Sequence, residues 1–386
     1  KHEKASYSSL YKPKRRNQNY PGGYYGSRTL CECLSPQELR VKDRIDGKVD
    51  RFRKTHERSF RMLERFDGKK PVIDIERALY FTQSMKETEG QPLVLRWAKA
   101  LRKIAENITV TVEDDMLLLG RAGSRGGRYG ILYPELDGDF LDVLIDDGIA
   151  VKDLPTRTTS PASIDPEDAR RVVEEIAPYW KGKTFHEALN AALPEDVHKL
   201  TYDDPKGLVS RYIVNETASF RSSIQWVHDY AKILKRGFNG IKKEAQEKLA
   251  ALDPLSAKDT CEKKPFLDAV VIVCDAIVLW AKRYAQAARE KAAVTTDPQR
   301  KAELLRMAQN AEHVPGEPAR DFWEACQSQW FTQMFSRLEQ KTGTTISNGR
   351  MDQYFYPYYK ADVEAGKLDD SKAMELLECM WVGMAE

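Results

Sequence analysis

The chain has 386 residues, of which 31% are charged and 41% hydrophobic, and its formal net charge at pH 7 is +2. This is an ordinary globular composition, long enough for two average domains or one large domain. The near balance of charge gives no support for a nucleic-acid partner, and no run approaches the ~18 apolar residues that a membrane-spanning helix requires.

Residues 1–34 form a basic segment that differs from the rest of the chain. Residues 1–30 carry seven Lys or Arg against one acid, and they are rich in Tyr, Ser, Gly and Asn. A segment with so few aliphatic residues cannot bury enough apolar surface to fold alone. We therefore expect residues 1–34 to be a disordered extension. Because the charge is local, a polyanion-binding arm is the alternative.

From residue 35 the pattern predicts a predominantly α-helical region with one small β-hairpin. Ser35 and Pro36 are typical of a helix start. Ile108–Val112 and Met116–Arg121 alternate around a turn at Glu113–Asp115, as the arms of a hairpin do. The predicted helices are Ser35 to about Phe66, Asp74–Lys86, Leu93–Asn107, Ser163 to about Tyr179, Leu208–Arg236, Gly240–Leu252, Cys261–Ala293, Pro298–Val314 and Pro318–Leu338.

The end of the chain predicts that residues 35–386 are the N-terminal part of a longer, truncated domain. Residues 373–386, AMELLECMWVGMAE, are apolar and periodic and contain neither a cap nor a breaker. A helix that ends in this way would leave apolar side chains exposed around Met380, Trp381 and Met384.

No self-sufficient active site is visible in the sequence. Cys31 and Cys33 form C-x-C without a second pair at zinc-ligand spacing, and the other four cysteines are scattered, so free thiols and no metal are predicted. Gly120–Gly130, GRAGSRGGRYG, matches neither a Walker motif nor G-x-G-x-x-G. No serine-hydrolase or zinc-hydrolase pattern occurs. We therefore predict no catalytic residue within the chain.

Arg221 and Gln225 are the candidate substrate-binding residues. In a helix their i, i+4 spacing puts both side chains on one face. Arginine is always charged and offers a planar fork of donors, which suits an anion such as a carboxylate, phosphate or sulfonate, and Gln225 adds an amide donor. On spacing alone, an ion pair between Arg221 and Glu216 or another acid is the structural alternative.

Thr342–Tyr359, TGTTISNGRMDQYFYPYY, joins a polar, glycine-containing loop to five aromatic side chains. As a local pattern it predicts a helix start docked on a core. Its arrangement S-x-G-R-x-D-Q-Y-x-Y-P-Y resembles the corresponding segment of glycyl radical enzymes, the pyruvate formate-lyase-like superfamily. The resemblance runs from about Cys33 to Glu386, and its other blocks are Arg77–Leu101, Leu117–Leu136 and Phe322–Gln340.

The resemblance implies a fold of the α/β class, a ten-stranded α/β barrel enclosed by helices in the full-length parent. It is strongest to the branch that cleaves the C–S bond of isethionate, giving acetaldehyde and sulfite under anaerobic conditions. The deciding feature is the Arg-x-x-x-Gln pair, here Arg221 and Gln225, which faces the sulfonate in that branch. The alternatives are another glycyl radical eliminase, acting on a diol, choline or hydroxyproline, and a non-catalytic truncated helical protein.

The cofactor that the resemblance implies is a glycyl radical in the protein itself, installed by a radical-SAM activating enzyme, with no metal in the lyase. The G-C-x-E loop and the R-V-x-G-[FYW] radical motif of the family do not occur in this sequence. Both are expected beyond Glu386, and the piece alone is expected to be inactive. The resemblance also implies a homodimer in the cytoplasm, with placement inside a bacterial microcompartment left open.

Overall fold

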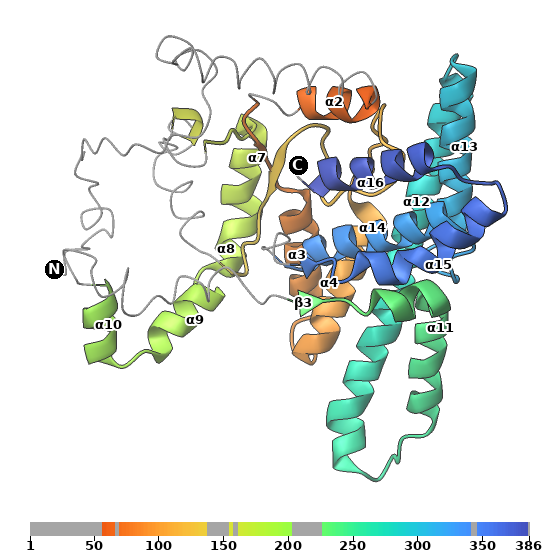
Figure 1. The fold of residues 1–386 in the computed structure, drawn as a ribbon. Helices are drawn as coiled ribbons and strands as arrows, with labels where there is room; N and C mark the ends of the chain where they lie inside the picture. Colours follow the sequence, from red (N-terminus) through yellow and green to blue (C-terminus); the bar gives the residue numbers. More distant parts are fainter. Residues whose placement is uncertain are drawn as a thin grey trace. The chain divides into compact units, whose positions relative to one another are not determined.

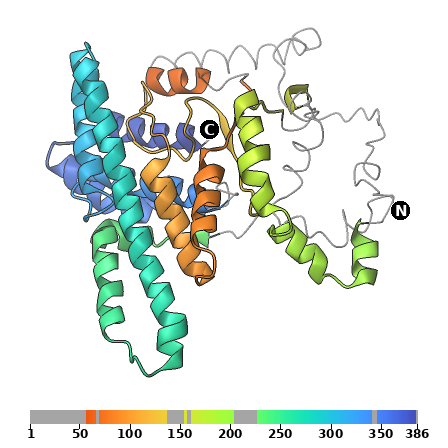
Figure 2. The ribbon, with the colours of Figure 1, turned by 180° about the vertical axis from the view of Figure 1, so that it is seen from behind.

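The computed structural model describes residues 56–65, 69–136, 154–156, 161–202, 226–340 and 346–384. The predicted extension 1–34 and the predicted helix start at Ser35 lie outside these residues. Helices dominate the described part of the chain (Figures 1 and 2). They are α2 (Glu57–Glu64), α3 (Glu76–Glu87), α4 (Leu93–Asn107), α7 (Pro166–Arg171), α8 (Ala177–Trp180), α9 (Phe185–Ala192), α10 (Glu195–Tyr202), α11 (Tyr230–Ala250), α12 (Lys264–Val294), α13 (Pro298–His313), α14 (Phe322–Glu339), α15 (Met351–Glu364) and α16 (Asp370–Met384).

The strands within the described residues are short and pair in twos. They are β1 (Val72–Asp74), β2 (Tyr129–Ile131), β3 (Trp226–Val227) and β4 (Ile346–Ser347). Strand β1 pairs parallel with β2, and β3 pairs parallel with β4. Short 3-10 or π-helical turns complete the list at Leu154–Thr156, Val172–Ile176 and Asp259–Lys263.

The predominantly helical prediction is confirmed, and several predicted bounds hold. Helix α4 spans the predicted Leu93–Asn107. Pro298 begins α13 as predicted, where the Asp297 carboxylate accepts the Gln299 amide at 3.0 Å. Helix α3 starts at Glu76 rather than Asp74, because Asp74 ends strand β1. Capping residues and apolar periodicity act over a few neighbouring residues, so the sequence alone could reveal them.

The predicted hairpin over Ile108–Val112 and Met116–Arg121 is wrong, because neither segment is a strand. Side chains of helices, rather than a partner strand, satisfy the backbone of the second segment. Three residues of α14, at spacing i, i+4 and i+7, make these bonds. Trp323 Nε1 donates to Leu117 O (2.9 Å) and Trp330 Nε1 donates to Gly120 O (2.9 Å). Between them, Gln327 accepts from Leu119 N (2.8 Å) and donates to Leu119 O (2.7 Å). The second segment is thus a buried irregular segment whose backbone groups pair with side chains of α14.

The predicted helix Leu208–Arg236 is also wrong at the point where β3 occupies Trp226–Val227. Helix α11 begins after Asp229, whose carboxylate accepts the Lys232 amide at 3.0 Å. The predicted gap between Arg236 and Gly240 contains a kink at Gly237, where φ is +62°. A Cβ there would lie 2.2 Å from the carbonyl oxygen of Gly316, so both the backbone conformation and the space require glycine.

Helix α12 forms an antiparallel hairpin with α11 and also packs against α4 and α13 (Figures 1 and 2). Helix α14 packs against α11, α12, α13, α15, α16 and α4, and fifteen of its eighteen residues are buried. It is therefore the central helix of the described core. None of the described helices is both long and apolar enough to cross a membrane.

The expected exposure of the last helix is only partly correct. Met380 on α16 is fully buried, whereas Trp381 is 56% exposed. Gly383 packs so closely on α14 that a Cβ would lie 2.7 Å from the ring of Trp330. Helix α16 is therefore docked on the core of the described part of the chain.

A buried arginine anchors the C-terminal end of α14. Arg77 on α3 is 1% exposed, and its Nε donates to the carbonyl oxygen of Leu338 at 2.9 Å. Its guanidinium also pairs with the Glu135 carboxylate, at 2.8 Å from Nη1 and 2.6 Å from Nη2, and lies 4.3 Å from the ring centroids of Phe81 and Tyr133. A cation at the C-terminal end of a helix is electrostatically favourable. This contact fixes the point at which the chain leaves α14.

We expect Arg77→Ala to lower the free energy of unfolding by ~3–5 kcal/mol, because it leaves the buried Glu135 carboxylate without its partner. Urea unfolding followed by circular dichroism measures this loss. The control is Arg102→Ala, which removes an ion pair with Glu106 whose side chains are 50% and 40% exposed and should cost less than ~1 kcal/mol. If Arg77→Ala and the unmodified chain unfold at the same urea concentration, the anchoring role of Arg77 is contradicted.

Candidate functional site

The parallel strands β3 and β4 mark the candidate site. Trp226 pairs with Ile346 and Val227 with Ser347. Strand β3 follows directly on Gln225 in the sequence, and β4 follows directly on residue 345. Because the pair is parallel, both strands begin at the same edge. The predicted substrate-binding segment thus leads straight into a strand whose position α14 and β4 define.

Arg221 and Gln225 themselves lie outside the described residues. The predicted helix Leu208–Arg236, which would carry both residues, is wrong at Trp226 and Val227, because these two residues form β3. The i, i+4 argument holds only on a helix. The expected placement of Arg221 and Gln225 on one helix face stays a prediction, and their role depends on the family resemblance.

A row of polar side chains on α14 holds β3 and β4. Gln329, Gln333 and Ser336 are spaced i, i+4 and i+7 and are at most 7% exposed, so they lie on one buried face of the helix. The hydrogen bonds run from Gln329 Nε2 to Gln333 Oε1 (2.9 Å) and Asn348 Oδ1 (2.9 Å), from Gln333 Nε2 to Ile346 O (3.5 Å), and between Ser336 Oγ and His228 Nε2 (2.7 Å). Sequence reasoning missed these three residues.

Two buried polar atoms beside this row have no hydrogen-bond partner of standard geometry among the described residues. One is the side-chain amide oxygen Oε1 of Gln329, a residue that is fully buried. The other is the hydroxyl of Tyr230, which is 1% exposed. Burial raises the pKa of Tyr230, which a side-chain interaction with Gln329 partly offsets. An unsatisfied buried polar atom costs ~1–3 kcal/mol. The region next to β3 therefore combines high polarity with deep burial.

The aromatic motif after β4 forms the predicted helix start. Helix α15 begins at Met351, directly after Arg350. The Tyr354 hydroxyl donates to Asn348 O at 2.8 Å, and its ring lies 5.4 Å from that of Tyr230. The motif thus ties β4 to α11 and α14, which is a structural role.

The glycine- and arginine-rich loop is satisfied from within the protein. The buried Asp74 carboxylate accepts from the amide (2.5 Å) and hydroxyl (2.8 Å) of Ser124. Arg121, 4% exposed, pairs with Glu113 at 2.8 Å and donates to Gly127 O at 2.5 Å. These contacts occupy the Ser124 amide and the Arg121 guanidinium, two donors that a bound phosphate would otherwise use.

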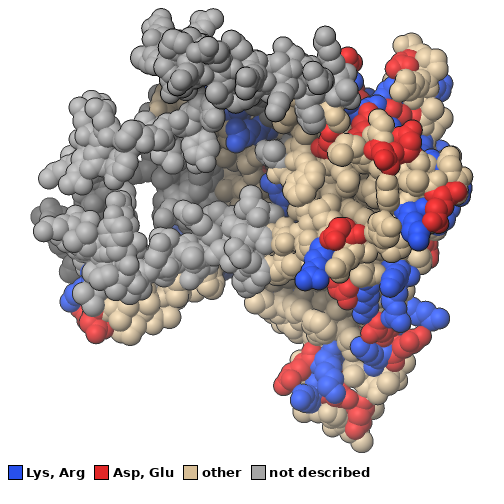
Figure 3. All heavy atoms as spheres, viewed as in Figure 1, with Lys and Arg blue, Asp and Glu red and all other residues tan. Residues whose placement is uncertain are grey.

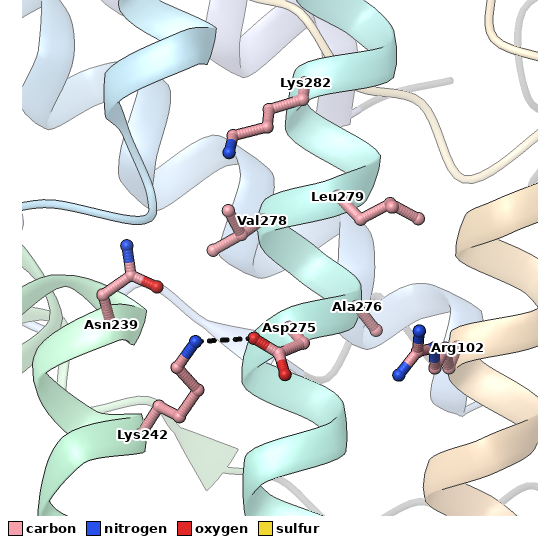
Figure 4. Close-up of a pocket in the computed structure, with 8 residues that line it drawn as sticks. All are labelled: Arg102, Asn239, Lys242, Asp275, Ala276, Val278, Leu279 and Lys282. Carbon is pink, nitrogen blue, oxygen red and sulfur yellow. Dashed lines mark hydrogen bonds and ion pairs between the residues drawn. The ribbon is translucent and has the colours of Figure 1, made fainter.

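A groove of about 440 Å³ lies between α4, α11 and α12 (Figure 4). Three cations line it, Arg102, Lys242 and Lys282, but Lys242 is paired with Asp275 at 2.8 Å and Arg102 with Glu106 at 2.8 Å. On the face shown in Figure 3, cationic and anionic side chains are interspersed over the described part. Two of the three cations of the groove are thus paired with carboxylates, so the groove offers little uncompensated charge and is not the candidate site.

The cysteines that the structure describes are free, and three are buried: Cys274, Cys326 and Cys379. Burial raises the pKa of Cys274 and of Cys379 to about 12, so both stay protonated thiols at neutral pH. Among the described residues, no group of three His, Cys, Asp or Glu side chains is placed to hold a metal ion.

His228 gives the β3 region a predictable pH dependence. Burial lowers its pKa below the ordinary value of 6.5, so between the two pKa values the unfolded chain binds the proton more tightly than the folded chain. We therefore expect the free energy of unfolding to fall as the pH drops below 6.5, by at most about 1.4 kcal/mol per pH unit from this group.

Urea unfolding between pH 5 and 8 measures this effect. The His228→Gln variant should lose part of the acid sensitivity, whereas Ser336→Ala should keep it, because burial and not the hydroxyl causes the pKa shift. An unchanged pH slope in His228→Gln would show that other groups cause the acid sensitivity.

Comparison with known proteins assigns the chain to a family. The family model for pyruvate formate lyase-like proteins matches residues 50–386. The chain is 80% identical over 360 residues to an isethionate sulfite-lyase of Desulfovibrio desulfuricans and 71% identical over 357 residues to that of Bilophila wadsworthia. These matches cover 93% and 92% of the chain, but 42% of each relative.

A solved structure of the glycerol-bound, B12-independent glycerol dehydratase from Clostridium butyricum matches with a TM-score of 0.75 and 34% identity. This match covers 85% of the chain and 39% of the dehydratase. The chain therefore spans about two fifths of the length of these relatives. It belongs to the pyruvate formate lyase-like family of glycyl radical enzymes.

Proposed function

We propose that the chain is part of an isethionate sulfite-lyase, a glycyl radical enzyme that cleaves the C–S bond of isethionate to acetaldehyde and sulfite without oxygen. The observation that carries the proposal is the 80% identity over 93% of the chain to a relative of that name. The second relative, at 71% identity, has the same name. Identity at this level across nearly the whole chain favours a shared substrate over a shared fold alone.

The proposed fold of the complete protein is the ten-stranded α/β barrel enclosed by helices. The protein-derived glycyl radical, installed by a radical-SAM activating enzyme, supplies hydrogen abstraction when it is present. The buried thiols of Cys274, Cys326 and Cys379 lack the G-C-x-E context of the family's reactive cysteine. We therefore assign neither the radical nor the catalytic groups to residues of this chain, and we propose that the chain alone is inactive.

The proposed task of this chain's residues is to bind and orient the sulfonate. Arg221 keeps its positive charge at every physiological pH and can donate two parallel hydrogen bonds to oxygens of one anion. Gln225 adds an amide donor without adding charge. Holding the leaving sulfonate in a fixed geometry favours the step in which sulfite departs. The position of Gln225 immediately before β3 supports this role, because a strand held by α14 is a rigid support for a binding residue.

A second glycyl radical elimination, acting on a diol, is the alternative that the 34% identity to a glycerol dehydratase keeps open. The two substrates differ in charge, because isethionate is an anion and a diol is neutral. A neutral substrate cannot compensate the cost of desolvating an arginine. Arg221 therefore favours the sulfonate, provided that it contacts the substrate.

The partners that follow are isethionate and the radical-SAM activating enzyme, with a homodimer as the proposed assembly. We propose a cytoplasmic location, with a bacterial microcompartment as the further possibility that isolation of such compartments would test.

The activity is tested with the complete polypeptide and its activating enzyme under strict exclusion of oxygen. We expect isethionate to yield equimolar acetaldehyde and sulfite, while glycerol, 1,2-propanediol and choline are not turned over. Electron paramagnetic resonance reports the glycyl radical independently of turnover. A clear radical signal without sulfite from isethionate would refute the substrate assignment, and turnover of a diol would favour the alternative.

Arg221→Ala should lower kcat/KM for isethionate by ~10²–10⁴-fold, because the loss of one partner from a desolvated ion pair costs ~3–5 kcal/mol. Gln225→Ala should cost less, about tenfold, because it removes one neutral donor. Arg221→Lys is the matched control that keeps the charge but loses the planar fork. Its kcat/KM should lie between those of Arg221→Ala and Gln225→Ala. Near-normal kinetics of Arg221→Ala, with a normal radical yield, would show that Arg221 does not bind the substrate.

A further inference from the structure

We propose that Gln329, Gln333 and Ser336 of α14 are positioning residues for substrate binding. They fix the strands β3 and β4, and β3 begins at Trp226, the residue that follows the proposed binding residue Gln225 in the sequence. This inference rests on the proposed function, because it assigns a role in binding the same substrate. None of the three residues is proposed to react, and each acts through the backbone or side chain that it holds.

The first step of the argument is that β3 and β4 need external support. Each strand has two residues, and their ladder consists of two residue pairs. A two-stranded ribbon is marginal on its own even when it is longer. The position of β3 therefore depends on groups outside the ladder.

The second step is that α14 supplies this support to both strands. The Ser336 hydroxyl bonds to His228, the residue after β3, at 2.7 Å. Gln329 donates to the Asn348 side chain, directly after β4, at 2.9 Å, and Gln333 donates to the carbonyl oxygen of Ile346 within β4. One face of one helix thus holds both strands at their ends.

The third step is that α14 is a rigid reference for these strands. Its first turn is capped by the Asp321 carboxylate, which accepts the Glu324 amide at 2.9 Å, and Arg77 fixes its last turn through Leu338 O at 2.9 Å. Fifteen of its residues are buried. A displacement of about 1 Å in a binding group can cost ~10²-fold in rate. Side chains that lock a short strand onto this helix therefore affect substrate binding at a distance.

The fourth step distinguishes positioning from general stability. The side-chain carbonyl oxygen of Gln329 and the hydroxyl of Tyr230 are buried, and neither makes a hydrogen bond of standard geometry with a described residue, although the two side chains interact. Apolar side chains of the same shape avoid such unpaired groups and are often at least as stable. Polar groups at this place are better explained by the need to set the path of β3 and β4 than by stability.

The same helix contains a matched control residue. Gln327 is also a glutamine and is also fully buried. It donates to and accepts from the backbone of Leu119, at 2.7 and 2.8 Å, and makes no described contact with β3 or β4. Gln327→Leu and Gln329→Leu are therefore the same chemical change in the same helix, applied to two different backbone segments.

The test measures thermal stability, radical yield, KM and kcat for isethionate in the complete, activated protein. We expect both glutamine variants to lose stability. Gln329→Leu should raise KM at least tenfold, whereas Gln327→Leu should keep KM within about twofold of the unmodified protein. Equal effects of the two variants on KM would overturn the proposal and leave Gln329 with a structural role alone.

A milder pair of variants keeps the test decisive if Gln329→Leu does not fold. Ser336→Ala removes the bond to His228 and should raise KM about three- to tenfold, while Ser336→Thr keeps a hydroxyl and should restore KM. Failure of the threonine variant to restore a raised KM, or an unchanged KM in Ser336→Ala, would contradict positioning through β3. If the unmodified protein carries the radical but does not cleave isethionate, the proposed function is wrong and this inference falls with it.

Discussion

The described part of the structure depends on buried polar side chains of the central helix α14, which have no access to water. Gln327, Gln329 and Gln333 are all at most 4% exposed. A buried amide must find hydrogen-bond partners inside the protein or destabilise it. A helix already satisfies its own backbone, so these side chains are available to backbone segments that belong to no regular element. The helix therefore organises the irregular parts of the fold as well as the core.

Two faces of α14 perform this task for different segments. The face of Trp323, Gln327 and Trp330 satisfies residues 117–120, and the face of Gln329, Gln333 and Ser336 holds β3 and β4. The remaining link is Arg77, which binds the carbonyl end of the helix and pairs with Glu135. Because this ion pair is buried, its value lies less in net stability than in fixing a single arrangement.

The helices of the described region could largely be predicted from the sequence, whereas the connections could not. Pro298 at the start of α13 is a local signal, and so is the periodic pattern of α4. Residues 117–120 belong to a short apolar run that a buried strand would also show, but their partners on α14 lie about two hundred residues away. Strand β3 was hidden within an apolar stretch that matches a helix equally well, and only its pairing with Ile346 and Ser347 decides between them. Long-range partners are absent from any local pattern.

The candidate site shows the same limit in a different form. Arg221 and Gln225 could be named because the chain resembles a family, and their placement on one helix face stays a prediction, because both lie outside the described residues. Gln329 could not be named, because polar residues such as Gln327 and Gln333 stand close to it in the sequence, and only the structure shows that this part of the helix has no solvent-facing side. A buried glutamine lowers the stability of the fold unless its amide forms hydrogen bonds with another part of the chain. Short strands in a buried part of the fold have no water to satisfy their polar groups, and buried amides on a neighbouring helix are a direct way to hold such strands in place.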